Sequence, residues 1–118
     1  MMKIVLDVYG GDYAPTKILK GAVMALNCEK PISLVLTGKE DEIKRELELL
    51  GCDMSRMEII DAPEVITNDD VPTTAIRSKK NSSLVAALTA LKEREDCVGM
   101  VSAGSTGAVL AGSIFILD

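Results

Sequence analysis

One uncharged stretch, Cys97 to Leu117, constrains the fold of this chain more than any other part of its sequence, and an aspartate bounds it on each side. Residues 97–101 are apolar and β-leaning, which predicts a strand buried on both faces. Residues 102–107 are mostly glycine, serine or threonine and predict a tight turn. From Thr106 onward the residues are apolar almost all round, which predicts a helix buried on every side. A strand, a glycine-rich turn and a helix in this order can bind an anion, because free N–H groups and the positive end of the helix dipole point out of the turn.

Two other interpretations of this stretch stay open. It is long enough to cross a bilayer, which takes about 20 apolar residues. Against a membrane helix, both flanks are acidic, no Lys or Arg adjoins the stretch, and Ser-Ala-Gly-Ser-Thr-Gly would lie at the middle of the span. The small residues could also serve only to let a helix pack close to a sheet, with no ligand involved.

The composition disfavours several classes of function. The 13 Lys and Arg residues against 18 Asp and Glu give a formal net charge of −5, which disfavours a nucleic-acid partner. Histidine is absent from the sequence, which removes the commonest general base, the commonest metal ligand and any Ser-His-Asp triad. Cys28, Cys52 and Cys97 lie far apart and indicate reduced cysteines. The N-terminal apolar run is too short for a signal peptide, so we expect a cytoplasmic protein. We also expect neither a metal nor a cofactor.

Strand and helix patterns alternate along the chain. Strand-like runs lie at 3–8, 32–37, 57–61 and 97–101, and helical patterns follow Pro15, Gly38, Asn81 and Ser105. Residues 62–74 are expected to be irregular. This alternation predicts an α/β fold with a parallel sheet and helices on both faces. The last apolar helix needs a cover, so we expect residues 1–118 to be the N-terminal portion of a single α/β domain, completed by further chain or by a partner.

Two further clusters are candidates for an anion site. Asp7 and the turn Gly10-Gly11-Asp12 lie at the carboxyl end of the first strand, where α/β sheets collect ligands. A plain turn between strand and helix would show the same residues. Arg77, Lys79 and Lys80 are the densest positive charge and precede a helix N-terminus, which favours an anionic ligand. An ordinary exposed basic turn is the alternative.

Residues 68–70, Asn-Asp-Asp, offer oxygen ligands of the kind that Mg²⁺ or Ca²⁺ binds. They lack the glycine and the ligand spacing of an EF-hand loop. Capping and solvation of a surface loop is therefore the favoured interpretation.

Three segments together resemble the N-terminal region of the PlsX-type phosphate acyltransferases of bacterial phospholipid synthesis. They are Ile-Val-Leu-Asp-Val-Tyr-Gly-Gly-Asp-Tyr-Ala-Pro at 4–15, Ala-Ile-Arg-Ser-Lys-Lys-Asn-Ser-Ser-Leu at 75–84 and Val-Ser-Ala-Gly-Ser-Thr-Gly-Ala at 101–108. The chain departs from the family at Val8-Tyr9, where Ala-Met is frequent, and at Tyr13, where His or Phe is frequent. Ser105 stands where Asn is also common, and both residue types cap helices. These departures remove no glycine or acid from the motifs.

The resemblance implies a three-layer α/β/α sandwich with a mostly parallel, Rossmann-like sheet, similar to the fold of phosphate acetyltransferases and of isocitrate and isopropylmalate dehydrogenases. It implies a homodimer. It also implies transfer of a fatty acyl group from acyl-carrier protein to inorganic phosphate, giving acyl phosphate for phospholipid synthesis, with loose peripheral association with the membrane.

If phosphate itself attacks the thioester, the enzyme needs no nucleophile, and its task is to hold the dianion and stabilise the oxyanion. On this interpretation the anion cradle consists of Ser102, Gly104, Ser105, Thr106 and Gly107. Gly10, Gly11 and Asp12 would face it, with Asp7 and Ser83 nearby, and Arg77, Lys79 and Lys80 would attract phosphate or dock the acidic carrier protein. No catalytic residue is assigned.

Other functions also fit this sequence. Another enzyme of the same fold, either a short-chain phosphate acyltransferase or a decarboxylating dehydrogenase, is the first alternative. A nicotinamide enzyme is disfavoured because no Gly-x-Gly-x-x-Gly follows a predicted strand. An inactive truncated fragment, or a non-catalytic module that pairs with another chain, is the second.

Overall fold

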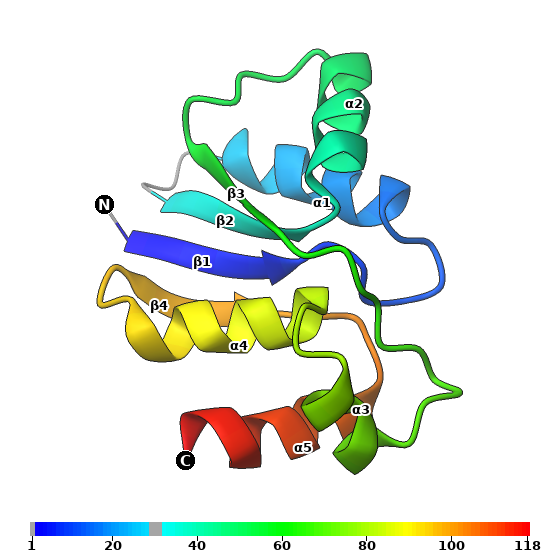
Figure 1. Ribbon diagram of the computed structural model, residues 1–118. Coiled ribbons are helices and arrows are strands. Elements are labelled where there is room, and N and C mark those ends of the chain that lie inside the picture. Colours follow the sequence, from blue (N-terminus) through cyan, green and yellow to red (C-terminus); the bar gives the residue numbers. More distant parts are fainter. Residues whose placement is uncertain (1, 29–31) are drawn as a thin grey trace.

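The structure, a computed structural model, describes residues 2–28 and 32–118 (Figure 1). Its strands are β1 (Met2–Asp7), β2 (Ile32–Gly38), β3 (Met57–Asp61) and β4 (Cys97–Val101). Its helices are α1 (Thr16–Leu26), α2 (Glu40–Leu50), α3 (Pro72–Ser78), α4 (Ser83–Glu93) and α5 (Thr106–Gly112), and a π-helical turn, η1 (Ser113–Leu117), continues α5. The predicted alternation of strands and helices is therefore confirmed.

All four described strands run parallel, in the order β3-β2-β1-β4. β1 and β2 pair without interruption from Met2 opposite Ile32 to Asp7 opposite Thr37. The pairing of β1 with β4 is irregular between Lys3 and Ile4. The carboxyl ends of the strands therefore meet at one edge of the sheet, the right-hand side in Figure 1.

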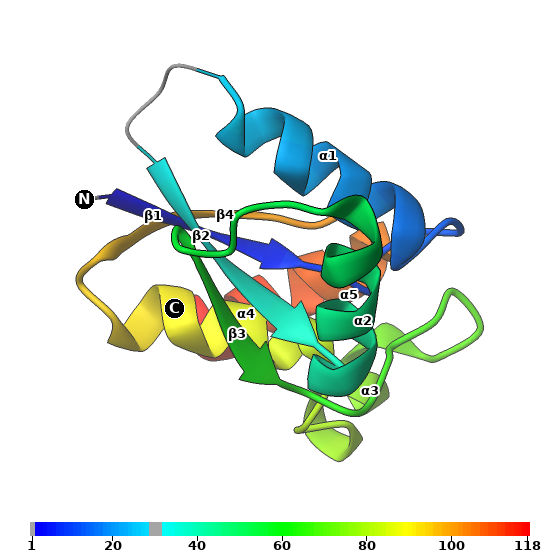
Figure 2. The ribbon, with the colours of Figure 1, turned by 90° about the horizontal axis from the view of Figure 1, so that it is seen from above.

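Helices cover both faces of this sheet, as predicted (Figures 1 and 2). α1 and α2 lie on one face, and α3, α4 and α5 lie on the other. The core is aliphatic on both faces: Leu19, Leu36 and Ile43 are fully buried on the first, and Leu88 on the second. Burying such side chains contributes about 1.5–3 kcal/mol each, which is the main force that holds the three layers together.

The expected burial of β4 and of the final helix is wrong for the described residues. β4 is an edge strand, and Val98 and Val101 are each 54% exposed. α5 buries its small residues, such as Ala108, against its neighbours, whereas Leu110 and Ile114 lie exposed on the other side of α5 and η1. No described element packs over that side, which is why the apolar pattern did not lead to full burial.

The stretch 62–74 is also more ordered than its sequence predicted. α3 begins at Pro72, a residue that fits the first helical position because its missing N–H would have had no partner there. Ile66 is buried in the cluster formed by α3, α4 and α5.

The uncharged stretch 97–117 is divided into β4, a turn, α5 and η1. None of the helices in the described part of the chain has the length and apolar character needed to cross a membrane.

Candidate functional site

The candidate site lies at the point where the order in which strands are added to the sheet reverses. From β1 the chain builds β2 and β3 on one side, and then returns to add β4 on the other side of β1. In open α/β sheets, ligands bind outside the carboxyl ends of the strands at such a switch point. The two glycine-rich turns, one after β1 and one after β4, both lie at this point (Figure 1).

The two turns touch each other through their backbones. A Cβ atom added to Gly10 would lie 2.6 Å from the backbone nitrogen of Gly104 and 3.1 Å from that of Ala103. Gly11 adopts φ +93°, a left-handed conformation, and a Cβ there would lie 3.1 Å from the carbonyl oxygen of Ala103. Position 10 therefore requires glycine because a side chain would collide with the second turn. Position 11 requires it because of its left-handed backbone conformation.

The carboxylate of Asp7 ties these turns together. Asp7 is 2% exposed, and its Oδ1 accepts a hydrogen bond from the backbone N–H of Tyr9 at 3.1 Å. Its Oδ2 accepts from the hydroxyl of Ser102 at 2.9 Å, and the Ser102 Oγ accepts in turn from the N–H of Gly104 at 3.2 Å. A buried carboxylate needs such donors, and here they come from both turns. Asp7 and Ser102 therefore organise the site from beneath.

A cavity of about 180 Å³ opens beside the joined turns. Its lining residues come from three segments: Tyr9, Gly11 and Asp12; Val65, Ile66, Thr67 and Asn68; and Gly104 and Ser105. Burial raises the pKa of the Tyr9 phenol, so this side chain stays uncharged, and Asp12 is the acidic residue of the same wall. The Lys39 ammonium lies 5.2 Å from the centre of the Tyr9 ring and brings positive charge to the same edge. Drug-sized ligands occupy about 300–1,000 Å³, so this volume suits a small anion.

Not every amide of the turn is available to a ligand. The N–H of Gly104 donates to Ser102 Oγ at 3.2 Å, and the N–H of Ala108 donates to Ser105 Oγ at 3.3 Å. Ser105 is thus the N-cap of α5, and the predicted capping role of this residue is confirmed. The first N–H groups of a helix have no intrahelical acceptor, which leaves the amides of Thr106 and Gly107 outside the helical ladder.

Of the predicted anion-binding residues, four line the cavity: Gly11, Asp12, Gly104 and Ser105. Asp7, Gly10 and Ser102 join the two turns beside it, and the other three residues have different places. Thr106 and Gly107 are exposed at the start of α5 and do not line the cavity. Ser83 is 2% exposed at the start of α4, where its carbonyl oxygen accepts from the Thr37 hydroxyl at 2.8 Å and its N–H donates to the Glu64 carbonyl at 3.0 Å. The structure thus uses Ser83 to join α4 to the carboxyl ends of β2 and β3.

The three basic residues between α3 and α4 do not form one patch. The Arg77 guanidinium lies over the Phe115 ring, 4.4 Å from its centre. Lys79 Nζ forms an ion pair with Asp70 Oδ2 at 2.8 Å. Lys80 is exposed. Of the three, only Arg77 and Lys80 present charge outward. Asp70, which offered an oxygen ligand for a metal, is instead the partner of Lys79.

Sequence reasoning missed the third wall of the cavity, formed by residues 65–68. This segment follows β3, and β3 ends at the same edge of the sheet as β1 and β4. The carboxyl ends of parallel strands meet at the same edge of the sheet, so the sequence could have predicted that residues 65–68 lie beside the two turns. Residues 68–70 were interpreted from their own side chains alone, which indicated a surface loop.

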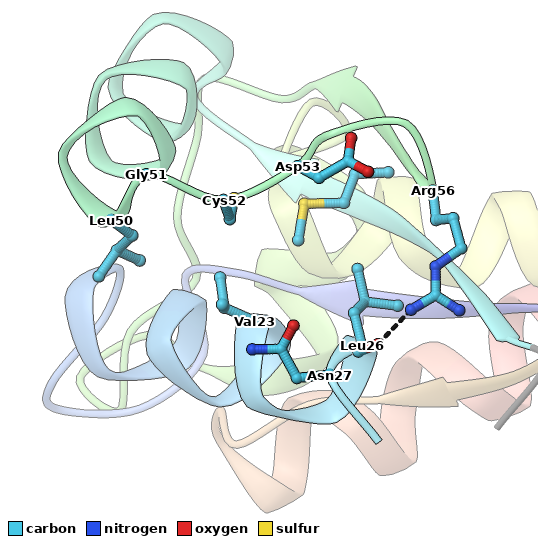
Figure 3. Close-up of a pocket in the computed structure, with 9 residues that line it drawn as sticks. Val23, Leu26, Asn27, Leu50, Gly51, Cys52, Asp53 and Arg56 are labelled. Atoms are coloured by element: carbon cyan, nitrogen blue, oxygen red, sulfur yellow. Dashed lines mark hydrogen bonds between the residues drawn. The ribbon is translucent and has the colours of Figure 1, made fainter. Parts of the chain in front are cut away.

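A second hollow, of about 280 Å³, lies at the opposite edge of the sheet, between the ends of α1 and α2 and the start of β3 (Figure 3). Its charged groups have partners within the chain. The Arg56 guanidinium donates to the carbonyl of Leu26, and Asp53 Oδ1 accepts from the N–H of Ser55 at 2.9 Å. It lies at the amino ends of the strands, so it is the weaker candidate for a ligand site.

The fold and the cavity together define a class: a doubly wound parallel α/β protein with its candidate ligand site at the switch point of the sheet. Comparison with known proteins then gives the family. Residues 2–118 match the family described as "Fatty acid synthesis protein", and the chain belongs to this family. The resemblance inferred from the three motifs is confirmed.

The curated relatives are named phosphate acyltransferases. The protein of Clostridium tetani is 51% identical over 116 residues, that of Dictyoglomus thermophilum 47% and that of Halothermothrix orenii 44%. Each match covers 98% of this chain but 34% of the relative. The chain therefore spans about a third of the length of these relatives.

Proposed function

We propose that this protein transfers a fatty acyl group from acyl-carrier protein to inorganic phosphate, giving acyl phosphate for phospholipid synthesis. The observation that carries the proposal is the cavity at the switch point, bordered by two glycine-rich turns in backbone contact and by residues 65–68. The names of the relatives, phosphate acyltransferases, support the same reaction class.

The reaction suits a chain without histidine. A phosphate oxygen attacks the thioester carbonyl carbon, the carbonyl oxygen becomes an oxyanion, and collapse of this intermediate breaks the C–S bond. The products are acyl phosphate and the carrier thiolate, which takes up a proton. Phosphate is the nucleophile, so the protein contributes orientation and electrostatic stabilisation. Removing one oxyanion donor typically costs about 10²–10³ in rate, so a few fixed donors account for much of the catalysis.

The cavity offers donors of the required kind. Gly11 and Ser105 line it from the two turns, and the side chain of Asn68 adds an amide that can donate two hydrogen bonds. Its small volume fits a phosphate rather than a whole acyl chain. The acyl chain and the carrier protein therefore approach from outside it, and the outward charges of Arg77 and Lys80 suit the acidic carrier. A cytoplasmic homodimer that associates loosely with the membrane completes the proposal.

The test uses the purified protein in the full length that its gene encodes. Acyl-carrier protein loaded with a long acyl chain is mixed with phosphate, and acyl phosphate and free thiol are measured together. Both products should rise in equal amounts and depend on phosphate. Thiol release that needs no phosphate would exclude the transferase. Reaction with short acyl thioesters alone would favour the short-chain alternative.

A pair of asparagines tests the location of the site. Asn68→Ala removes a donor from the cavity, whereas Asn27→Ala changes a residue of the opposite hollow. A hydrogen bond to a charged group contributes about 1.5–3 kcal/mol, so Asn68→Ala should raise the KM for phosphate about tenfold or more. Asn27→Ala should leave it unchanged. Equal effects of the two variants would remove the assignment of phosphate to this cavity.

We also propose that residues 1–118 form the N-terminal portion of a larger α/β domain. The support is the set of apolar side chains that the described residues leave exposed: Val101 on the edge strand, and Leu110 and Ile114 on α5 and η1. An apolar groove of about 400 Å³, bounded by Ile18, Leu34 and Val101, lies between α1 and the sheet. Large exposed apolar surfaces of monomeric proteins commonly mark an interface, which supports a cover over this groove. In the full-length protein, the backbone amides of β4 should exchange slowly with solvent. Rapid exchange of these amides would contradict the proposal that further chain covers β4.

A further inference from the structure

We propose that Lys79 is a positioning residue: it fixes residues 65–70 as the third wall of the cavity at the switch point. This role is different from the attraction of phosphate or carrier protein that its charge alone indicated. The identity of the ligand, phosphate, rests on the proposed function. The claim that Lys79 holds the wall in place rests on the geometry alone.

The side chain of Lys79 holds the wall at two points. Its Nζ donates to the carbonyl oxygen of Val65 at 2.9 Å and to Asp70 Oδ2 at 2.8 Å. The same Asp70 oxygen accepts from the backbone N–H of Thr67 at 2.8 Å and from its hydroxyl at 3.3 Å. The turn from Thr67 to Asp70 is therefore closed around one carboxylate oxygen, and Lys79 supplies the opposite charge and joins that turn to Val65. Asn68, which lines the cavity, lies within this turn.

Lys79 is itself held rigidly, so it can act as an anchor. Its backbone N–H donates to the Ala75 carbonyl at 2.8 Å, and its carbonyl accepts from the N–H of Ser82 at 3.1 Å. The Lys79 side chain is 31% exposed and that of Asp70 is 26% exposed, so solvent reaches the pair only in part. The Lys79 hydrogen bond is also the main reason that the pKa of Asp70 lies below its usual range. An anchored cation with a partly buried partner transmits position better than a flexible surface pair would.

A second tie fixes the other end of the wall. The N–H of Asn81 donates to Glu64 Oε1 at 3.1 Å, and the N–H of Glu64 donates to the Asn81 carbonyl at 3.1 Å. Residue 64 therefore stays in place without Lys79, and Ile66 is held by the apolar cluster of α3, α4 and α5. The turn from Thr67 to Asp70 lacks such packing, so it is the part of the wall that depends most on Lys79. Loss of Lys79 should loosen one wall and leave the other two walls intact.

The test compares three variants of the full-length protein. Lys79→Met keeps the chain length but removes the donor, Lys79→Arg keeps charge and donors, and Lys20→Met removes an exposed lysine of α1 as the control. Hydrogen exchange is measured over residues 65–70, with β1 as the check on folding, and phosphate KM and kcat are measured separately. Lys79→Met should speed exchange in 65–70 alone. It should raise the phosphate KM about tenfold, because misplacing substrate-positioning groups by ~1 Å can cost on the order of 100-fold.

The remaining variants should separate position from charge. Lys79→Arg should restore most of the phosphate affinity, and Lys20→Met should match the unmodified protein. Asp70→Asn, which weakens the same contact from the other side, should reproduce the faster exchange and the raised KM of Lys79→Met. Faster exchange with an unchanged phosphate KM would overturn the role in the site, and unchanged exchange would overturn the anchoring itself. If the unmodified protein neither binds phosphate nor makes acyl phosphate, the proposed function fails, and the exchange data still decide whether Lys79 fixes the wall.

Discussion

The replacement of Gly10 by alanine tests the contact on which the candidate site depends. A Cβ at this position would lie 2.6 Å from the Gly104 nitrogen and 2.9 Å from Ser102 Oγ, whereas an ordinary contact begins near 3.4 Å. The Gly104 nitrogen is backbone and cannot turn aside as a side chain can. The two turns must therefore move apart by most of an ångström, which stretches the hydrogen bonds that join them through Asp7.

The size of this effect follows from the geometry. Forcing one extra carbon into a closely packed position typically costs about 1–3 kcal/mol. Gly21→Ala is the matched control, because a Cβ on this exposed residue of α1 meets no atom within 4 Å. Alanine in a helix interior is favoured over glycine by about 0.5–1 kcal/mol, so the control should gain stability. The same substitution should thus change the free energy of unfolding in opposite directions at the two positions.

Urea unfolding of the purified variants, followed by circular dichroism, measures both changes. Phosphate KM is measured on the folded protein, and it should rise for Gly10→Ala only. If Gly10→Ala unfolds at the same urea concentration as the unmodified protein and retains its phosphate KM, the turns do not touch as described. The reasoning about a joined site would then be wrong.

Two further predictions concern other contacts. Ser102→Ala leaves the Gly104 N–H and one oxygen of Asp7 without their partners, and it should lower the free energy of unfolding by about 1–3 kcal/mol, measured by urea unfolding against the unmodified protein. At the opposite edge of the sheet, hydrogen bonds from Arg94 lower the pKa of Asp96 to about 2. Because this folded-state pKa lies below the unfolded value, the stabilisation is complete above about pH 4 and is lost as the pH falls toward 2. Thermal unfolding between these pH values should show the loss, and Arg94→Met should reduce it; an equally steep loss in that variant would contradict the assignment.

Local patterns predicted the elements of this fold well. The strands Met57–Asp61 and Cys97–Val101 begin and end where the sequence predicted them. Gly51 ends α2 in a left-handed conformation, with φ 64°, as is usual for a glycine that ends a helix. These features depend on neighbours in the sequence, so the sequence alone was sufficient to place them.

Burial was predicted less well, because it depends on which elements pack together. The pattern from Thr106 onward is apolar on all sides, but within residues 2–28 and 32–118 α5 packs through the side that carries Ala108 and Ala111. The same limit applied to the site. Both glycine-rich turns were identified, yet the contact between Gly10 and Gly104 joins residues far apart in the chain. Only the strand order, with β4 beside β1, brings them together.

The carboxylate of Asp7 holds together the two turns that border the cavity. It is buried, and Tyr9 and Ser102 donate hydrogen bonds to its two oxygens, so its position beneath the site is fixed. The Gly104 N–H is directed to Ser102 Oγ and away from a ligand. Under the proposed function, phosphate would bind in the open cavity, between Gly11 and Asn68, while Asp7 continues to hold the two turns in contact.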